Sequence, residues 1–424
     1  MYPFEPPAIY LHESVCKIPA ALARAERMLA QIDGPELIVV DDAQLDELSH
    51  ANRWDASGVR LGQLKRTGDP ALIFNTFRWR TPQEAQAAAE RYPHLRRGYL
   101  LGTGEWTYRD GRATRKTHLG VCQNAWELHS AWGCLHRCDY CDVGNFLNLV
   151  VNLEEFVERL EGLVRENPWC RLYKYDNHTD TITFEPEYGA SELLVGFFAR
   201  QAAPAGPDGS YLMLYTKSAN VEHLLDLDHR GHTIICWSLS PDTVSRLVEK
   251  NSASTSERIG AAQRCQQAGY HVRMRFSPFV PVRGWREESE AMIEELLTRV
   301  RPDLLTMDTF KWLEPRVIGD ILDLDLWDDE FRGYVEQYAA MEPAQRPAPI
   351  IPQGKQVFPH EARARVYRFL LEQVRRYAPS IPVSLCGETP QMWEELAAEL
   401  RMTPEQYVCT CGPDSVPGNP LLQQ

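Results

Sequence analysis

One segment of the sequence carries most of its chemical information: Trp132-Gly133-Cys134-Leu135-His136-Arg137-Cys138-Asp139-Tyr140-Cys141. Its three cysteines, Cys134, Cys138 and Cys141, follow the spacing C-x3-C-x2-C. Cysteine thiolates are the usual protein ligands of iron–sulfur clusters, and three of them this close together can hold three irons of a cubane [4Fe–4S] cluster. The fourth iron would then have no cysteine and would be open to another ligand.

The spacing, with an aromatic residue (Tyr140) directly before the third cysteine, resembles the signature of the radical S-adenosylmethionine (radical SAM) superfamily. In that superfamily the open iron binds SAM, whose reductive cleavage gives methionine and a 5′-deoxyadenosyl radical that abstracts hydrogen from a substrate. The resemblance implies a [4Fe–4S] cluster on Cys134, Cys138 and Cys141, SAM as the second cofactor, and a one-electron reductant such as flavodoxin or ferredoxin as a partner.

Other uses of these cysteines stay open. Zinc also binds clustered cysteines, and Cys122 or His136 would be the fourth ligand, although zinc sites usually show two separated pairs. The alternative from another functional class is therefore a zinc-stabilised binding protein without catalysis. A disulfide is disfavoured, because Met1–Pro7 lacks the basic region and apolar core of a secretory signal. A reducing, cytoplasmic environment is expected for the 11 cysteines.

The composition is that of an ordinary globular protein, with 424 residues of which 44% are hydrophobic and 25% charged. No stretch approaches the roughly 18 apolar residues of a membrane span, so no membrane partner is expected. The formal net charge of −14 argues against a surface that binds nucleic acid throughout. Two basic segments, Arg91–Arg97 and Arg109–Lys116, are candidates for a local contact with a polyanion.

Hydrophobic periodicity predicts an α/β chain. Helices are expected at about 15–33, Pro82–Tyr92, Leu153–Glu166, Ser254–Ala268 and Glu288–Val300. Strands are expected at Leu37–Val40, Leu72–Phe74, Arg171–Tyr175, Tyr211–Thr216, Thr233–Ser238, Val272–Phe279 and Leu304–Met307. Because strands alternate with helices between about 120 and 312, parallel βαβ units are favoured. We expect a partial (β/α)6 TIM-like barrel with its chemistry at the C-terminal ends of the strands.

Three units are expected along the chain. An N-terminal α/β extension covers residues 1–115, the partial barrel covers 116–315, and a C-terminal extension covers 316–424. A proline-rich break at Pro343–Ile350 lies within the C-terminal extension, which is expected to be rich in α-helix from His360 to about Leu400.

Further segments are similar to the spore photoproduct lyase family, and the similarity extends over roughly residues 1–310. Members of this family are radical SAM enzymes that reverse a methylene-bridged thymine dimer in DNA, so the resemblance implies a lyase that repairs a DNA lesion, with DNA or a nucleoside as substrate. The segments that carry it are Met1–Pro6, Thr216–Leu227, Ile235–Leu239, Thr255–Ala262, Ala268–Tyr270, Phe276–Pro278 and Gly284–Trp285.

The resemblance also implies roles for residues at the ends of predicted strands. Lys217 would pair with the carboxylate of SAM, and Ser238 would donate a hydrogen bond to the same group. Asp180, which follows Thr179, would accept a hydrogen bond from an amino or ribose group of the cofactor. Two arginines on one face of a predicted strand are candidates for binding substrate phosphate or SAM: Arg273 and Arg275.

The sequence departs from the family at two positions. The family has a cysteine shortly before this Asp step that gives a hydrogen atom to the substrate radical, whereas this chain has Asp176 or Asn177. The family also has a tyrosine directly after the third cluster cysteine, where this chain has Asp142. Three tyrosines are candidates to substitute: Tyr140, Tyr173 and Tyr175.

The C-terminal extension adds cysteines that the resemblance does not account for. Cys386 precedes a Gly, and Cys409 and Cys411 form a C-x-C motif followed by Gly-Pro, a turn that can aim two thiols the same way. These three are candidate ligands of a second iron–sulfur cluster, and Cys409 or Cys411 is alternatively a catalytic hydrogen donor. The remaining cysteines are expected to be buried thiols: Cys16, Cys122, Cys170, Cys236 and Cys265.

Three hypotheses result. The first is a spore photoproduct lyase-like radical SAM enzyme that repairs a thymine lesion. The second is a radical SAM enzyme that modifies a nucleoside, a peptide or a small metabolite. The third is the zinc-stabilised binding protein.

Overall fold

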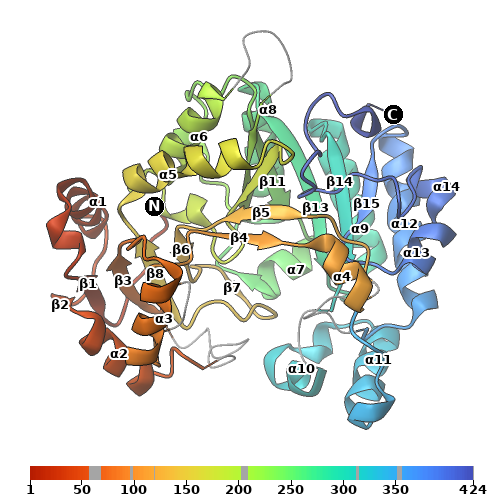
Figure 1. Cartoon of the computed structure of the whole chain (residues 1–424). Helices are drawn as coiled ribbons and strands as arrows, with labels where there is room; N and C mark the ends of the chain where they lie inside the picture. Colours follow the sequence, from red (N-terminus) through yellow and green to blue (C-terminus); the bar gives the residue numbers. More distant parts are fainter. Residues whose placement is uncertain are drawn as a thin grey trace.

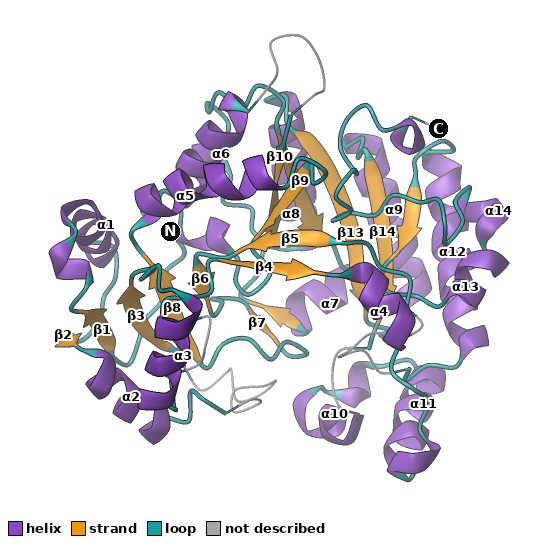
Figure 2. Ribbon diagram, viewed as in Figure 1, coloured by secondary structure: helices purple, strands orange, loops and turns teal. Residues whose placement is uncertain are grey.

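The computed structural model describes residues 1–56, 68–95, 99–118, 120–201, 209–311, 315–350 and 356–423. In these ranges the chain forms two main β-sheets with helices packed around them, and a two-stranded ribbon (Figures 1 and 2). The mixed α/β class with parallel sheets is the one that the sequence predicts.

The smaller main sheet has the strand order β2-β1-β3-β8-β6. Its first four strands are parallel, and β6 is antiparallel to β8. Helices α2 and α3 each begin with a capping box that satisfies backbone donors of the first turn. The elements are β1 (Ile9–His12), α1 (Pro19–Leu29), β2 (Leu37–Val40), α2 (Asp42–Ala51), β3 (Ala71–Asn75), α3 (Pro82–Arg91), β6 (Ala131–Trp132) and β8 (Phe146–Val150).

The larger sheet has eight strands in the order β15-β14-β13-β11-β10-β9-β5-β4. All neighbouring pairs are parallel except β4 with β5. This is the predicted partial barrel, with one parallel strand more than expected. Its strands are β4 (Trp106–Arg109), β5 (Ala125–Leu128), β9 (Leu172–Tyr175), β10 (Tyr211–Thr216), β11 (Thr233–Ser238), β13 (His271–Phe279), β14 (Leu304–Thr309) and β15 (Val383–Leu385).

Helices connect these strands in βαβ order, as Figure 2 shows in purple around the orange sheet. Their buried faces supply Phe156 and Leu160 from α5 and Ile293 from α9 to a single large core. The helices are α4 (Gly111–His118), α5 (Leu153–Glu166), α6 (Ala190–Arg200), α7 (Asp242–Leu247), α8 (Thr255–Gln267), α9 (Trp285–Arg299), α10 (Pro315–Ile321), α11 (Asp329–Ala340), α12 (His360–Tyr377), α13 (Pro390–Glu395) and α14 (Ala397–Leu400).

The tail after α14, dark blue in Figure 1, folds back onto the large sheet. The carbonyl of Pro413 accepts hydrogen bonds from the backbone N–H groups of Arg171 (2.8 Å) and Leu172 (3.1 Å) at the start of β9. Val416 is fully buried in an apolar cluster with Tyr211 and Met213 of β10. The tail therefore fills the concave side of the partial barrel near the N-terminal ends of its strands.

Two features of the topology were not predicted. The C-terminal extension contributes a strand, β15, which pairs with β14 and extends the large sheet. The strands β6 and β8, which flank the cysteine loop, belong to the N-terminal sheet, because β8 pairs with β3. The boundary near residue 115 stays a prediction, and this pairing links residues on both of its sides.

The predicted burial of the remaining cysteines is only partly confirmed. Cys170, Cys236 and Cys265 are buried as predicted, but Cys16 is exposed and Cys122 is only partly buried. Cys16 lies in a short 3-10 turn (Val15–Lys17) that buries only Val15, so its side chain faces outward.

The two basic segments also differ from a simple charged surface. Arg109 forms an ion pair with Glu127, and Arg115 pairs with Glu405, so part of the charge of the segment Arg109–Lys116 is already matched within the protein. In the segment Arg91–Arg97, residues 96 and 97 lie outside the described residues. Contact with a polyanion stays a prediction for both segments.

Among the helices that the structure describes, none has both the length and the apolar character that crossing a bilayer requires.

The docked tail leads to a stability prediction. Val416→Asp would place an unpaired carboxylate in the apolar cluster on β10, and we expect the free energy of unfolding to fall by about 3 kcal/mol or more. Urea denaturation at neutral pH measures this change. The exposed substitution Gln423→Asp is the matched control and should change it by no more than about 0.5 kcal/mol. Equal stability of the two variants would mean that the tail is not docked in solution.

Candidate active site

The three cysteines of the signature lie on the loop between β6 and β8. The loop starts at Gly133, whose φ of 96° is left-handed and where a Cβ would lie 2.0 Å from the carbonyl oxygen of Phe146, so only glycine fits. Farther along, β7 (Arg137–Cys138) pairs antiparallel with β12 (Glu249–Lys250). The amide N–H of Asp139 also bonds to the carbonyl of Val248 at 2.9 Å. The cysteine loop is therefore held as a strand of a small ribbon.

The arrangement of the cysteines fits a cluster better than a single ion. Zinc binds sulfur at about 2.3 Å, so its sulfur ligands can lie no more than about 4.6 Å apart. Among the described residues, the groups of three potential ligands within 4.8 Å of one another are His50–Asp55–His94 and His129–Asp176–His178, and the cysteine triplet is not one of them. A cubane binds each thiolate through a different iron. The side chains of Cys134, Cys138 and Cys141 all line one pocket, as a shared cluster requires.

Burial, together with the charge of Asp180, raises the pKa of the Cys134 thiol. The protein alone therefore keeps this thiol protonated. Coordination by a metal deprotonates such a group, so cluster binding and loss of the proton are coupled.

Asp180 joins the cysteine loop to the end of β10. Its carboxylate accepts hydrogen bonds from the His136 ring (2.8 Å), the Thr216 hydroxyl (3.0 Å) and the backbone N–H of Lys217 (2.7 Å). Both oxygens are thus used within the protein. Asp180 lines the pocket as predicted, but these contacts make it a residue that positions the loop.

Glu249 is the second buried carboxylate beside the loop. It forms an ion pair with Arg258 at 2.7 Å, both side chains being fully buried, and it accepts hydrogen bonds from the hydroxyls of Ser240 (3.1 Å) and Tyr140. Burial alone would raise the pKa of Glu249, but the charges of Arg258 and Lys217 lower it to about 2. Glu249 is therefore a fixed anion that holds Tyr140 in place.

Lys217 is held more loosely. Its Nζ lies 3.8 Å from the Glu249 oxygen that accepts from Tyr140 and Ser240, whereas Arg258 pairs with the other oxygen of Glu249. The same Nζ lies 5.9 Å from the centre of the Tyr140 ring. Its side chain keeps 17% of its surface exposed, toward the pocket. Lys217 therefore has capacity for an anionic ligand.

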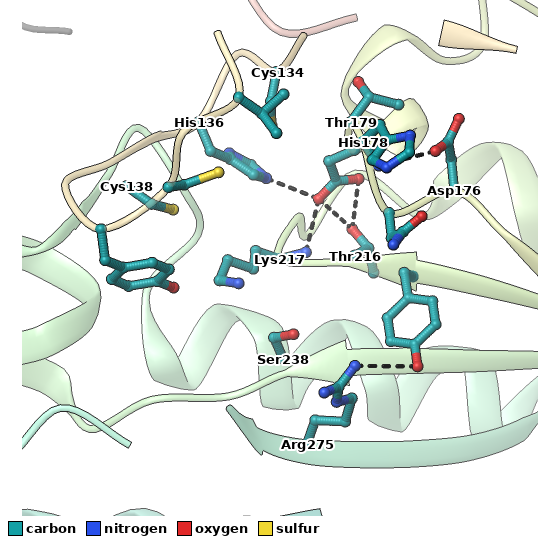
Figure 3. Close-up of a pocket in the computed structure, with 16 residues that line it drawn as sticks. Cys134, His136, Cys138, Asp176, His178, Thr179, Thr216, Lys217, Ser238 and Arg275 are labelled. Atoms are coloured by element: carbon teal, nitrogen blue, oxygen red, sulfur yellow. Dashed lines mark hydrogen bonds and ion pairs between the residues drawn. The ribbon is translucent and has the colours of Figure 1, made fainter. Parts of the chain in front are cut away.

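The strand ends form the opposite wall of the pocket (Figure 3), whose volume is about 210 Å³. Lys217 follows β10, Ser238 ends β11, and Arg275 lies beside Ser238 on β13. Figure 3 shows these three side chains facing the loop that carries His136 and Cys138. The predicted residues Tyr140, Thr179, Asp180, Lys217 and Ser238 all line this pocket.

The segment after β9 contains a hydrogen-bonded group that the sequence analysis did not predict. Asp176 accepts hydrogen bonds from the His129 ring and from the backbone N–H of His178, both at 2.9 Å. The His178 ring stacks on His129 with 4.4 Å between ring centres, and its buried Nδ1 has no hydrogen-bond partner among the described residues. Because the oxygens of Asp176 take N–H donors, this group is a hydrogen-bonded wall of the pocket. No spacing pattern in the sequence connects His129 with this group.

Two of the candidate tyrosines face elsewhere. Tyr173 packs against Phe198 of α6, and Tyr175 hydrogen bonds to the hydroxyl of Ser130. Neither is among the residues that line the pocket, whereas Tyr140 is.

The C-terminal cysteines come together without forming a common metal site. Cys411 accepts a hydrogen bond from Arg109 at 2.9 Å, Cys386 accepts one from Arg275 at 3.5 Å, and Cys409 donates to Gln123 at 3.1 Å. A guanidinium on a sulfur opposes a metal cation on the same sulfur, so these contacts give no support to a second cluster. A hydrogen bond from Cys409 and the charge of Arg109 lower the pKa of Cys411.

The pocket histidine leads to a pH prediction. Burial lowers the pKa of His178 to about 4, from an ordinary value of 6.5. The unfolded chain therefore binds more protons than the folded chain between these two values, and the free energy of unfolding must fall as the pH is lowered through this window. We expect the stability of the wild type relative to His178→Gln to decrease from pH 6.5 to pH 4 and to be constant above about pH 7.

Urea denaturation at a series of pH values checks this prediction. Asn177→Gln, at the neighbouring exposed position, is the control and should show a constant difference from the wild type over the same range. A constant difference for His178→Gln would contradict the burial of a neutral imidazole.

The chain is similar in sequence to several known proteins. The spore photoproduct lyase family model matches residues 118–320, which include the cysteine loop, Lys217 and Ser238. The spore photoproduct lyase of Bacillus subtilis is 25% identical over 193 residues, covering 44% of this chain and 55% of the relative. That of Clostridium acetobutylicum is 22% identical over 177 residues, covering 40% and 51%. The chain thus spans about half the length of the curated relatives it matches.

Solved structures extend the likeness of the fold. Spore photoproduct lyase complexed with dinucleoside spore photoproduct superposes with a TM-score of 0.59 at 17% identity, covering 90% of this chain and 98% of that chain. A double mutant of spore photoproduct lyase with bound AdoMet (SAM) and dinucleoside spore photoproduct gives a TM-score of 0.57 at 15% identity, covering 91% and 99%. The chain is thus similar to the spore photoproduct lyase family over residues 118–320, just under half of its length.

Proposed function

We propose that this protein is a radical SAM enzyme of the spore photoproduct lyase type, acting on a thymine lesion in DNA or on a closely related nucleoside. One observation carries the proposal: Cys134, Cys138 and Cys141 line the same pocket as Lys217 and Ser238. Three thiols for a cluster thus share a pocket with a cation and a hydroxyl that suit the charged end of an amino acid.

The three thiolates would hold a [4Fe–4S] cluster. When bound, such a cluster supplies the electron for the reductive cleavage of SAM to methionine and a 5′-deoxyadenosyl radical, with flavodoxin or ferredoxin as the proposed reductant. Asp180, through His136, and Glu249, through Tyr140, keep the loop in position for this group.

Lys217 and Ser238 would bind the carboxylate of SAM. Lys217 carries a positive charge that Glu249 does not fully compensate, because Glu249 pairs more closely with Arg258. The hydroxyl of Ser238 lies on the neighbouring strand and donates to the same group. Thr179, whose buried hydroxyl has no partner among the described residues, is the proposed donor to the rest of the cofactor.

The lesion substrate is proposed from the relatives. One solved relative is complexed with dinucleoside spore photoproduct. Restoring thymine requires a hydrogen atom, and this chain has Asp176 and Asn177 where the family has its donor cysteine. We propose Tyr140, which lines the pocket, as the donor, with Cys409 and Cys411 as the next candidates; Cys411 packs against the cluster that contains Tyr215 of the pocket wall.

A second candidate is a radical SAM enzyme for another nucleoside, a peptide or a small metabolite. The wall formed by Asp176 and His178 favours it, because an imidazole with an unpartnered nitrogen offers proton transfer where the family offers hydrogen-atom transfer. A purely zinc-stabilised binding protein is disfavoured by the spacing of the cysteine sulfurs.

Repair of the lesion tests the function directly. Anaerobically reconstituted and reduced protein is incubated with SAM and DNA that carries spore photoproduct, and restored thymine and 5′-deoxyadenosine are quantified together. We expect both products from the wild type. Cys134→Ser should abolish both, because it removes one ligand of the cluster.

The matched control is Cys16→Ser, which removes an exposed thiol remote from the loop and should retain both products. 5′-Deoxyadenosine without thymine would support the second candidate over lesion repair. Absence of both products from cluster-loaded protein would overturn the radical SAM proposal.

A prediction for the cofactor site follows. Lys217→Met should weaken SAM binding about tenfold or more, since a charge-assisted hydrogen bond is lost. Glu249 keeps its pair with Arg258, so the fold should survive. Equilibrium dialysis of SAM against cluster-loaded protein measures the effect, with the exposed Lys17→Met as control. Unchanged affinity would remove Lys217 from the SAM site.

A further inference from the structure

Arg275 lies on the pocket wall below Ser238 and has no carboxylate partner among the described ion pairs (Figure 3). The neighbouring arginine on the same face of β13, Arg273, is different, because it forms a bidentate pair with Asp303 at 2.8 and 3.0 Å. Of the two arginines that the sequence singled out, one is therefore neutralised within the protein and the other is not.

The contacts of Arg275 are with neutral hydroxyls and a thiol. Its Nη1 donates to the hydroxyl of Tyr215 at 3.2 Å, and its Nη2 donates to the hydroxyl of Ser277 at 3.2 Å and to the sulfur of Cys386 at 3.5 Å. Its Nε is buried and has no hydrogen-bond partner in the described part of the chain. These neighbours fix the guanidinium and leave two of its five donors unused, one on Nε and one on Nη1.

Other cations lie close to Arg275 in the interior of the protein. Arg109 and Lys174 share the single carboxylate of Glu127, each at 3.0 Å. Lys174 and Arg275 lie 5.1 and 5.4 Å from the ring of Tyr215. Asp308 reaches Arg275 through Ser277 and forms an ion pair with Lys311. Asp176 and Asp180 also line this pocket, and their oxygens accept hydrogen bonds from other residues of the protein.

We infer that Arg275 is the binding site for an oxyanion of the substrate, a phosphate or a carboxylate, in the pocket shared with SAM. The inference rests on the proposed function and names the chemistry of its substrate. A planar guanidinium with an unused Nε–H suits an oxyanion, which can accept two parallel hydrogen bonds. Lys217 and Ser238 are the proposed binding partners of the SAM carboxylate, so Arg275 is available to the substrate.

Binding of simple oxyanions tests the inference without knowledge of the substrate. Inorganic phosphate and acetate are titrated separately into cluster-loaded, SAM-bound protein at constant ionic strength, and binding is followed by calorimetry. We expect saturable binding of at least one anion in the millimolar range. Which of the two binds more tightly distinguishes a phosphate-bearing from a carboxylate-bearing substrate.

Variants assign the binding to the residue. Arg275→Gln should weaken the anion about tenfold or more, and Arg275→Lys, which keeps the charge but loses the planar fork, should weaken it less. Arg246→Gln removes the same charge from the exposed surface of α7 and should have no effect. If Arg275→Gln does not fold, Arg275→Lys still has to bind more weakly than the wild type.

Three results would overturn the inference. They are the absence of saturable anion binding to the wild type, an equal loss in Arg275→Gln and Arg246→Gln, and a loss of SAM affinity in Arg275→Gln, which would place the SAM carboxylate on this arginine. SAM affinity and the 5′-deoxyadenosine formed without substrate are measured on the same samples. If SAM binding and 5′-deoxyadenosine formation are observed but anion binding is not, the proposed enzyme class is retained and only the oxyanion site is rejected.

Discussion

The active site depends on one buried ion pair, Glu249 with Arg258. Neither side chain has any exposed surface, so each would be a costly isolated charge without the other, and breaking such a pair typically costs about 3–5 kcal/mol. Both side chains of the pair also form hydrogen bonds with neighbouring residues. Arg258 also donates to the carbonyls of Ala253 and Ser238, while Glu249 accepts from Tyr140. One interaction thus ties the cysteine loop to the end of β11.

On the other side of the loop, Asp180 ties the cysteine loop to the end of β10. It accepts hydrogen bonds from the His136 ring and from the backbone N–H of Lys217. The two carboxylates explain how a loop with little regular structure presents three thiols to one pocket. They also explain why Lys217, which lies between them, remains available. Its backbone N–H donates to Asp180, and its Nζ lies 3.8 Å from the nearest carboxylate oxygen of Glu249. The preorganised part of the site is therefore the cysteine loop and its surroundings, and the free charges are those that face the ligands.

Local sequence patterns predicted much of this molecule. Tyr211–Thr216 and Thr233–Ser238 form strands with the predicted bounds because short β-branched and aromatic runs are buried on both faces of a parallel sheet. The cysteine spacing likewise indicated the pocket. What the sequence did not disclose depends mainly on contacts between distant segments: β15 beside β14, β8 beside β3, and the cysteine loop beside Glu249. No spacing rule indicated that Arg109 would contact Cys411 or that Arg275 would contact Cys386, and the role of the C-terminal cysteines as ligands stays a prediction.

The anchoring of the cysteine loop has a consequence for biogenesis. Cys134, Cys138 and Cys141 are synthesised more than 100 residues before Arg258, and the ribbon partner Glu249–Lys250 is also made later. A ribosome adds about 5–20 residues per second, so the loop emerges seconds before the segments that shape it. The thiols therefore cannot be arranged for a cubane on the nascent chain. For the proposed cluster, iron and sulfide would be delivered after the synthesis of the barrel, and the thiols would have to stay reduced during that interval.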